Sequence, residues 1–285
     1  MKKYFPHILY LSGLFSIIGT MVTLKYAAIT NAMSIFESIW IKTTIAMILL
    51  TPFQLKNFKH IKKTDIKFII ITSLCGIYDA YAANLSWSHL PINNATLLMY
   101  LHPFIMTFLA YLMLKEKIAI SNIVAMMICF FGVCISIDFT RDLDHLFWYL
   151  ILFSNLFVAS IGFIYLKKLT SSYPSSFIVY LRMFAISVTS IFVIKGKIPN
   201  INEGNIWLVL ILVCGYMYER IAIAKAYSLI EIGKLQPLRF ANIIFASLLG
   251  YLVLGEVITN RQILSILIIL FALLVANISK FKKKI

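Results

Sequence analysis

Charged residues are scarce in this chain. Only 13% of its 285 residues are Asp, Glu, Lys or Arg, whereas 61% are hydrophobic, and the mean hydropathy is +0.91. A soluble domain has about a quarter charged residues, so this chain could not hide its apolar side chains in a core surrounded by water. We therefore expect the lipid bilayer to be its solvent.

Acidic residues are the scarcest of the charged types. The chain has 11 Asp and Glu against 26 Lys and Arg, which gives a formal net charge of +15. In a soluble protein this charge would suggest nucleic acid as a partner. In a membrane protein, basic residues instead mark the cytoplasmic loops, so we expect no nucleic-acid partner.

Residue patterns of several enzyme and pump classes are also missing. No glycine-rich phosphate-binding loop occurs, so the chain is not expected to power itself with ATP. No His-Glu-x-x-His pattern occurs, and among five scattered histidines only His102 lies deep in an apolar run. The four cysteines lie inside apolar runs without metal-ligand spacing, which favours a role as small apolar filler. We expect no cofactor, no metal and no enzyme activity, and a purely structural subunit is equally disfavoured.

Long apolar runs dominate what is present. Their length of about twenty residues predicts membrane-spanning helices rather than barrel strands, which would alternate over about ten residues. Lys2 and Lys3 could open a signal peptide, but no small-x-small cleavage site follows, so we expect the first helix to be retained. Ten predicted segments cover residues 7–24, 33–53, 67–87, 93–114, 119–137, 147–167, 174–194, 205–228, 234–254 and 261–279.

The basic residues orient these segments. With the N-terminus inside, the inner segments carry fifteen lysines and the outer loops five basic residues, Lys25, Arg141, Lys195, Lys197 and Arg261. This ratio predicts that both termini are cytoplasmic and that the number of spans is even. All four tryptophans fall in the outer parts of their helices, where an aromatic belt is expected.

The chain also contains an internal repeat. Residues 93–120 resemble residues 235–258 when the two stretches are aligned with an offset of 140. The matching pairs are Tyr111 with Tyr251, Leu112 with Leu252, Leu114 with Leu254, Glu116 with Glu256, and Ile118 with Ile258. Residues 1–140 and 141–285 would then each form a five-helix repeat. An odd number of spans per repeat means that the repeats enter the membrane from opposite sides, as in secondary transporters, whose substrate site lies near the midplane.

Charged residues inside the predicted spans are candidates for that site. A charge at the bilayer centre costs about 3 kcal/mol, so these residues are expected to face a cavity or one another. They are Glu37, Asp79 and Glu219 against Lys42, Arg182, Arg220, Lys225, Lys234 and Arg239. Lys225 and Lys234 are expected to reach the inner surface, and Arg239 fits either location. Asp79 lies about 18 Å into its helix, at mid-membrane. It could pair structurally with Lys42 or Arg182, or it could hold a cation or proton in the pathway.

Neighbouring residues leave further alternatives open. Glu219 and Arg220 are adjacent and about 100° apart on a helix, so at most one is expected to centre on the cavity. His102 could be a structural donor or part of a proton relay. Pro103 is expected to kink its helix. Small and hydroxyl-bearing residues form a stripe on one face of the first predicted helix: Ser12, Ser16, Gly19, Thr20 and Thr23. The stripe could serve close packing against another helix, or it could form the wall of a pore.

Motifs recur at the two aligned stretches. The first half carries Leu90-Pro91, Ala95, Pro103 and Leu114-Lys115-Glu116, and the second half carries Pro237-Leu238-Arg239-Phe240 and Leu254-Gly255-Glu256. This pattern resembles the drug/metabolite transporter superfamily, specifically its bacterial EamA branch, across nearly the whole chain. Lys42 and Arg182 stand where the family often has arginine. Two departures are Lys115, where the family triplet has glycine, and Ile243, which replaces the first-half proline.

The resemblance implies an all-α inner-membrane protein of ten transmembrane helices in two inverted five-helix repeats. It also implies a central cavity lined mainly by helices 1, 3, 4, 6, 8 and 9, and a small organic substrate. Coupling to a proton or a counter-substrate stays open, as does the choice between monomer and homodimer.

Mixed charge predicts a zwitterionic substrate, such as an amino acid or S-adenosylmethionine, moved by alternating access. The carboxylate would meet Arg239 or Arg182, and the cationic end would meet Asp79 or Glu219. Tyr100 and Phe240 could stack on a ring or a cation of the substrate. The predicted substrate-binding residues are Asp79, Tyr100, His102, Arg182, Glu219, Arg220, Arg239 and Phe240. The alternative is proton-coupled drug or metabolite efflux with Glu219 or Asp79 as the proton carrier.

Overall fold

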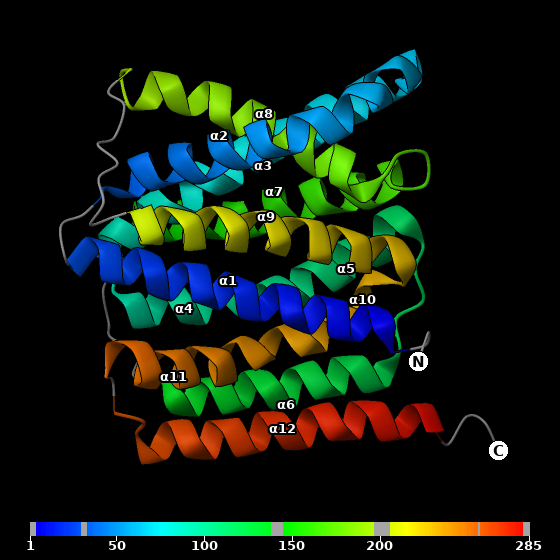
Figure 1. The fold of residues 1–285 in the computed structure, drawn as a ribbon. Coiled ribbons are helices and arrows are strands. Elements are labelled where there is room, and N and C mark those ends of the chain that lie inside the picture. The colour runs from blue at the N-terminus through cyan, green and yellow to red at the C-terminus, as the bar shows by residue number, and fades with distance from the viewer. Residues whose placement is uncertain (1–3, 30–32, 138–144, 197–205, 256, 282–285) are drawn as a thin grey trace. The chain divides into compact units, whose positions relative to one another are not determined.

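The computed structural model describes residues 4–29, 33–137, 145–196, 206–255 and 257–281, and nearly all of them are helical (Figure 1). Within these residues, eight stretches are long and apolar enough to span a membrane, and two shorter apolar helices are Ile120–Ser136 and Asn260–Leu274. They fall on the ten predicted segments, so the prediction of an all-helical protein with ten spans is confirmed. Several residues used to orient the chain or align the repeat lie outside the described part: Lys2, Lys3, Arg141, Lys197, Glu256 and Lys282–Lys284.

The helices follow one another with short connections. Their bounds are α1 Phe5–Ile29, α2 Ile35–Gln54, α3 Ile66–His89, α4 Ile92–Met99, α5 His102–Leu114, α6 Ile120–Ser136, α7 Leu146–Leu169, α8 Ser175–Val193, α9 Ile206–Leu229, α10 Ile232–Leu235, α11 Ala241–Leu254 and α12 Asn260–Phe281. Three 3₁₀ segments join them, η1 Leu55–His60, η2 Lys63–Asp65 and η3 Gln236–Phe240.

The 140-residue offset extends far beyond the stretch that revealed it. Corresponding helices begin 140 residues apart in four pairs, α2 with α8, α3 with α9, α4 with α10, and α6 with α12. A constant offset of this kind requires that neither repeat has gained or lost a residue between these helix starts. The helical pairs therefore support the two-repeat architecture residue by residue.

The fourth span of each repeat is broken, at positions that overlap but are not identical in the two repeats. In the first repeat α4 ends at Met99 and α5 starts at His102, with Pro103 in the first turn of α5. In the second repeat α10 is followed by η3, which contains Pro237, and then by α11. Proline has no N–H to donate and clashes with the preceding turn, so each span restarts near its proline. The predicted kink at Pro103 is thus a break that precedes it.

Both broken spans also end in the same backbone conformation. Lys115 has φ 54° and Gly255 has φ 66°, and these two residues are 140 positions apart. This left-handed conformation costs a residue with a Cβ about 1–2 kcal/mol, whereas glycine adopts it freely. The lysine that departs from the family triplet therefore occupies a position whose geometry favours glycine.

Two compact units can be distinguished, one of residues 1–80 and 165–229 and the other of residues 81–164 and 230–285. In the first unit α1 lies along α9, and α2 packs on both α8 and α9 (Figure 1). In the second unit α6 lies along α12, and η3 packs on α5 and α6. Each unit thus combines helices of both sequence repeats.

A buried apolar cluster forms the core of the second unit. It comprises Tyr100, Met126, Cys129, Val133, Phe240, Ile243, Ile269 and Ala272. Many large apolar side chains elsewhere are exposed, including Phe131, Phe192 and Leu274. Large exposed apolar surface on membrane-length helices is what lipid contact requires.

Candidate functional site

Five charged side chains gather in the first unit, near the middle of four helices. Lys42 comes from α2, Asp79 from α3, Arg182 from α8, and Glu219 and Arg220 from α9. Arg182 is only 5% exposed and Glu219 only 6% exposed. Charges this far from helix ends are costly in a membrane unless they pair or face water, and they usually mark a functional pathway.

Four of these charges are related by the repeat. Lys42 and Arg182 are 140 positions apart, and so are Asp79 and Glu219. Each repeat therefore contributes one cation from its second span and one carboxylate from its third span. Applying the offset to the whole sequence, and not only to the fourth spans, would have found this relationship before the structure.

The two carboxylates converge on Arg220. Its Nη1 lies 3.8 Å from Asp79 Oδ2, and its Nε lies 3.3 Å from Glu219 Oε1. Of the adjacent pair Glu219 and Arg220, one was expected to pair with a neighbouring helix, and Arg220 does reach Asp79 on α3 while it also turns back towards Glu219. Whether either residue faces a cavity stays a prediction. Asp79 was expected to pair with Lys42 or Arg182, and the structure also brings it within ion-pair distance of Arg220.

The two repeat-related cations are also seated in matching places. A Cβ added to Gly76 on α3 would lie 2.9 Å from Arg182 Nε, so the missing side chain makes room for the guanidinium. The residue 140 positions later is Tyr216 on α9, and Lys42 Nζ lies 5.2 Å from the centroid of its ring. Arg220 Cζ lies 5.1 Å from the same centroid. Cations at these distances from an aromatic face are attracted by its π-electrons.

The cluster carries an imbalance of charge. Among its five side chains, three are cationic and two are anionic. Arg220 supplies the extra positive charge, because the residue 140 positions earlier is Ala80. Such a cluster can bind both ends of a zwitterion, with carboxylates for a cationic group and arginines for a carboxylate.

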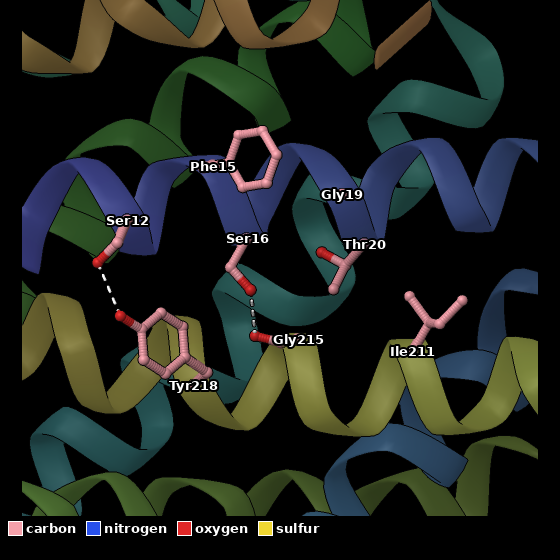
Figure 2. A pocket seen from close by; sticks show the side chains of 8 residues that line it. All are labelled: Ser12, Phe15, Ser16, Gly19, Thr20, Ile211, Gly215 and Tyr218. Atoms are coloured by element: carbon pink, nitrogen blue, oxygen red, sulfur yellow. Dashed lines mark hydrogen bonds between the residues drawn. The ribbon is translucent and has the colours of Figure 1, made fainter. Parts of the chain in front are cut away.

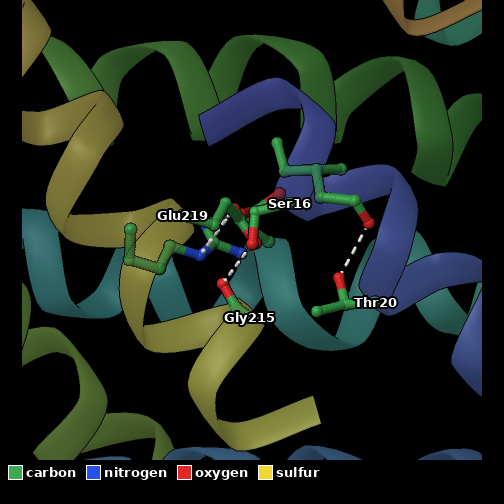
Figure 3. Close-up of polar contacts among 7 residues, drawn as sticks. Ser16, Thr20, Gly215 and Glu219 are labelled. Atoms are coloured by element: carbon green, nitrogen blue, oxygen red, sulfur yellow. Dashed lines mark hydrogen bonds and ion pairs between the residues drawn. The ribbon is translucent and has the colours of Figure 1, made fainter. Parts of the chain in front are cut away.

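Beside the cluster, α1 and α9 form a groove with a volume of about 320 Å³ (Figure 2). Ser12 Oγ lies 2.8 Å from the Tyr218 hydroxyl, and Ser16 Oγ donates to the Gly215 carbonyl oxygen at 2.9 Å. Glu219 follows Gly215 by one helical turn on α9 (Figure 3). The polar stripe of the first helix therefore both packs against α9 and lines a groove, so each of its two interpretations describes part of it.

Glycine 215 sets the distance between these two helices. A Cβ on this residue would lie 2.7 Å from Thr20 Cγ2, closer than carbon atoms approach. Small residues allow membrane helices to approach closely and to hydrogen-bond across their interface. The helix that carries Glu219 and Arg220 is thereby held against α1.

The other four predicted site residues lie in the second unit. Tyr100 and Phe240 were expected to stack on a substrate; in the structure they stack on each other, with ring centroids 5.5 Å apart and planes 16° apart. His102 is buried, and its Nε2 lies 3.4 Å from Ser160 Oγ, which favours the structural interpretation of this histidine. Arg239 is half-buried at the end of η3. A role of these four in substrate binding stays a prediction.

Three other charged residues of the predicted spans lie near the ends of those spans: Glu37, Lys225 and Lys234. Glu37 is not a mid-membrane charge: it caps α2, where Ser34 N donates to Glu37 Oε2 at 2.8 Å and Glu37 N donates to Ser34 Oγ at 3.3 Å. The Ser-x-x-Glu spacing of this capping box was present in the sequence and signals a helix start. Lys234 pairs with Glu231 at 2.6 Å and is largely exposed, and Lys225 is exposed, as expected of lysines that reach the surface.

Helical spans in two repeats, with charges buried in mid-span, are an arrangement found in transporters. The model of the EamA-like transporter family matches the chain twice, over residues 5–137 and 146–278, so the chain belongs to this family within the drug/metabolite transporter superfamily. It is a multi-pass membrane protein of a family that transports small molecules. A search of curated proteins found no match.

Among the solved structures that match, one shares the fold over nearly its whole length. It is titled only "Crystal structure of protein", and it is 14% identical to this chain with a TM-score of 0.78. The likeness covers 97% of this chain and 99% of that chain. At this identity the likeness shows the fold alone.

Proposed function

We propose that this protein moves a zwitterionic metabolite across the bacterial inner membrane by alternating access, with both termini in the cytoplasm. The substrate class is an amino acid or an amino-acid derivative such as S-adenosylmethionine. The observation that carries the proposal is the five-charge cluster around Arg220, because three cations and two carboxylates match a ligand that has both signs of charge.

Each end of such a ligand has a partner in the cluster. Asp79 and Glu219 hold the ammonium or sulfonium group, and Arg182 or Arg220 holds the carboxylate through charge-assisted hydrogen bonds. Tyr216 offers an aromatic face to a cation. Tyr100, His102, Arg239 and Phe240 are further proposed contacts, but the proposal does not depend on them.

Transport by purified protein in liposomes tests the proposal. Radiolabelled S-adenosylmethionine should accumulate, and unlabelled amino acids should compete with it. Asp79→Asn should lower uptake about tenfold, the equivalent of about 1.4 kcal/mol. Glu231→Gln removes an accessible carboxylate near the end of a span, and it should leave uptake unchanged. Equal uptake by Asp79→Asn and the unchanged protein would remove Asp79 from the substrate site.

A second candidate function is proton-coupled efflux of a drug or metabolite. Carboxylates within membrane spans are typical of proton pathways, and Asp79 and Glu219 are the two candidates for the proton carrier. A pH gradient imposed on the liposomes separates the two functions. Exchange of like solutes ignores the gradient, whereas proton antiport follows it.

A further inference from the structure

A basic surface lies where α2 ends and α3 begins. Residues 54–68 contain five lysines and a single acidic residue, Asp65. All five lysines are exposed, and the end of α7 adds a sixth exposed lysine beside them. We call these six residues the basic face: Lys56, Lys59, Lys62, Lys63, Lys67 and Lys168. Orientation in the membrane requires basic residues at this end of the spans, but it does not require them to be held in fixed positions.

Tyr173 fixes the turn that carries these lysines. Its hydroxyl donates to Asp65 Oδ2 at 2.8 Å and accepts from Lys62 N at 3.0 Å. Tyr173 is buried, and Thr64 Oγ1 lies 3.5 Å from Asp65 Oδ1. The only acidic side chain of the segment is therefore turned to hydroxyl groups, and the lysines around it form an ordered surface of one sign of charge.

One aromatic ring brings together two lysines of the basic face that come from different helices. Lys67 Nζ lies 4.9 Å and Lys168 Nζ lies 4.5 Å from the centroid of the Phe68 ring. The ring itself is held by stacking on Tyr165, with centroids 5.3 Å apart and planes 22° apart. The two ammonium groups are therefore within about 10 Å of each other, where like charges still repel in 0.1 M salt. An anion bound between them would relieve this repulsion.

Large apolar side chains are exposed next to the same lysines. Phe53 is 74% exposed, Leu55 58% and Phe58 42%. Phe58 is nevertheless fixed by edge contacts with the rings of Phe177 and Tyr180, at 5.3 and 6.0 Å between centroids. A soluble anion would satisfy the lysines but leave these apolar side chains in water. A phospholipid satisfies both, because its headgroup and its acyl chains meet at the membrane interface.

We propose that the basic face is a binding site for anionic phospholipids, with phosphatidylglycerol as the representative headgroup. Lys67 and Lys168 hold a headgroup phosphate from two sides, and Phe53, Leu55 and Phe58 lie among the acyl chains. The bound lipid thereby joins the start of α3 to the end of α7. The site is separate from the five-charge cluster, and it does not depend on which solute the protein moves.

Thermal unfolding in detergent micelles tests this site without any measurement of transport. Added dioleoylphosphatidylglycerol should raise the melting temperature of the unchanged protein until the effect saturates, because a ligand that binds the folded state stabilises it. Dioleoylphosphatidylcholine has the same acyl chains and no net charge, and it should give little or no rise. Inorganic phosphate should also give none, since it has no acyl chains to cover the apolar side chains.

A double variant locates the site. Lys67→Gln with Lys168→Gln should raise the phosphatidylglycerol concentration needed for half of the effect about 30-fold, the equivalent of about 2 kcal/mol. Lys67→Arg with Lys168→Arg keeps both charges and should stay within about threefold of the unchanged protein. The matched control is Lys117→Gln with Lys225→Gln, which removes two exposed lysines outside the basic face and should leave the concentration within about twofold.

Salt provides a measurement that needs no variant. Raising NaCl from about 0.1 M to about 1 M shortens the Debye length from about 10 Å to about 3 Å, so more phosphatidylglycerol should be required for the same stabilisation. Equal stabilisation by phosphatidylcholine or by inorganic phosphate would overturn the inference. An equal loss of phosphatidylglycerol binding in the control pair would overturn it as well, because it would show that only the total charge of the protein matters.

Discussion

Tyr100 and Phe240 stack face to face, with centroids 5.5 Å apart, and they occupy the same position in the two repeats, 140 residues apart. Tyr100 is the C-cap of α4, and Phe240 is the N-cap of α11. The two broken spans therefore meet, inside the second unit, at the points where each is interrupted.

Loss of this ring pair should destabilise the protein. Tyr100→Leu removes the stacking, which is worth about 0.5–1.5 kcal/mol beyond the area buried, whereas Tyr100→Phe keeps it. We expect a lower melting temperature in detergent for the leucine variant and a smaller change for phenylalanine. Tyr111→Leu, at a residue 51% exposed, is the control and should change stability by less than about 0.5 kcal/mol. Equal melting temperatures for the leucine and phenylalanine variants at residue 100 would show that the stack contributes nothing.

Glu116 should be a structural carboxylate. Its Oε2 accepts a hydrogen bond from Ile232 N at 2.7 Å and lies 3.5 Å from Gly233 N, at the start of α10. Glu116→Ala leaves these buried amides without their acceptor and should cost about 1–3 kcal/mol of unfolding free energy. Glutamine retains an acceptor oxygen and should cost less.

The control for Glu116 is a more exposed carboxylate in the same region. Glu231 pairs with Lys234, and this ion pair is partly exposed, so Glu231→Gln should cost less than about 1 kcal/mol. Thermal unfolding in detergent measures all three variants. A loss at Glu116 no larger than at Glu231 would contradict the capping role.

Lys115→Gly should stabilise the protein. Lysine at φ 54° is destabilised by about 1–2 kcal/mol in the left-handed conformation, and glycine removes this strain. The gain in stability is reduced by the greater entropy of the unfolded chain with glycine. The reverse change, Gly255→Lys, should destabilise by a similar amount. Lys117→Gly, outside the left-handed region, should give no gain. A lower melting temperature for Lys115→Gly would mean that the lysine makes contacts worth more than the strain.

Gly76→Ala should disturb the seat of Arg182. The new methyl group would lie 2.9 Å from Nε, and the flexible arginine would shift rather than the helix. We expect a small change in melting temperature but a clear fall in uptake of labelled S-adenosylmethionine. Gly19→Ala, whose Cβ would meet nothing within 4 Å, measures the stability effect of alanine in a helix alone. Normal uptake by Gly76→Ala would show that the position of Arg182 is not critical.

Much of the fold could be predicted from the sequence, because a membrane-spanning helix needs an apolar run of about twenty residues. Apolar runs of about twenty residues gave all ten segments, and the repeat was visible from identities such as Tyr111 with Tyr251. The roles of individual charges could not be predicted in the same way. That Arg220 folds back onto Glu219, or that Glu116 reaches the start of α10, depends on side-chain reach and on packing between distant segments.

Glu37 and Tyr100 illustrate the two kinds of difference. For Glu37 a local signal existed, Ser34 three residues earlier, and it identified a helix cap rather than a membrane charge. For Tyr100 no local signal existed, since whether an aromatic ring meets a ligand or another ring depends on the tertiary structure. Short-range patterns can thus predict helix ends, although this one was not used for Glu37, whereas contacts between the repeats depend on the tertiary structure.

The uniform spacing of the helix starts also gives this molecule an internal reference. Because four pairs of helices start 140 residues apart, most of the chain can be aligned with itself as two rows, one for each repeat. Aligned pairs with the same chemistry, such as Asp79 with Glu219, indicate a role that both repeats share. Columns that differ, such as Ala80 with Arg220 and Gly76 with Tyr216, mark where the copies have specialised.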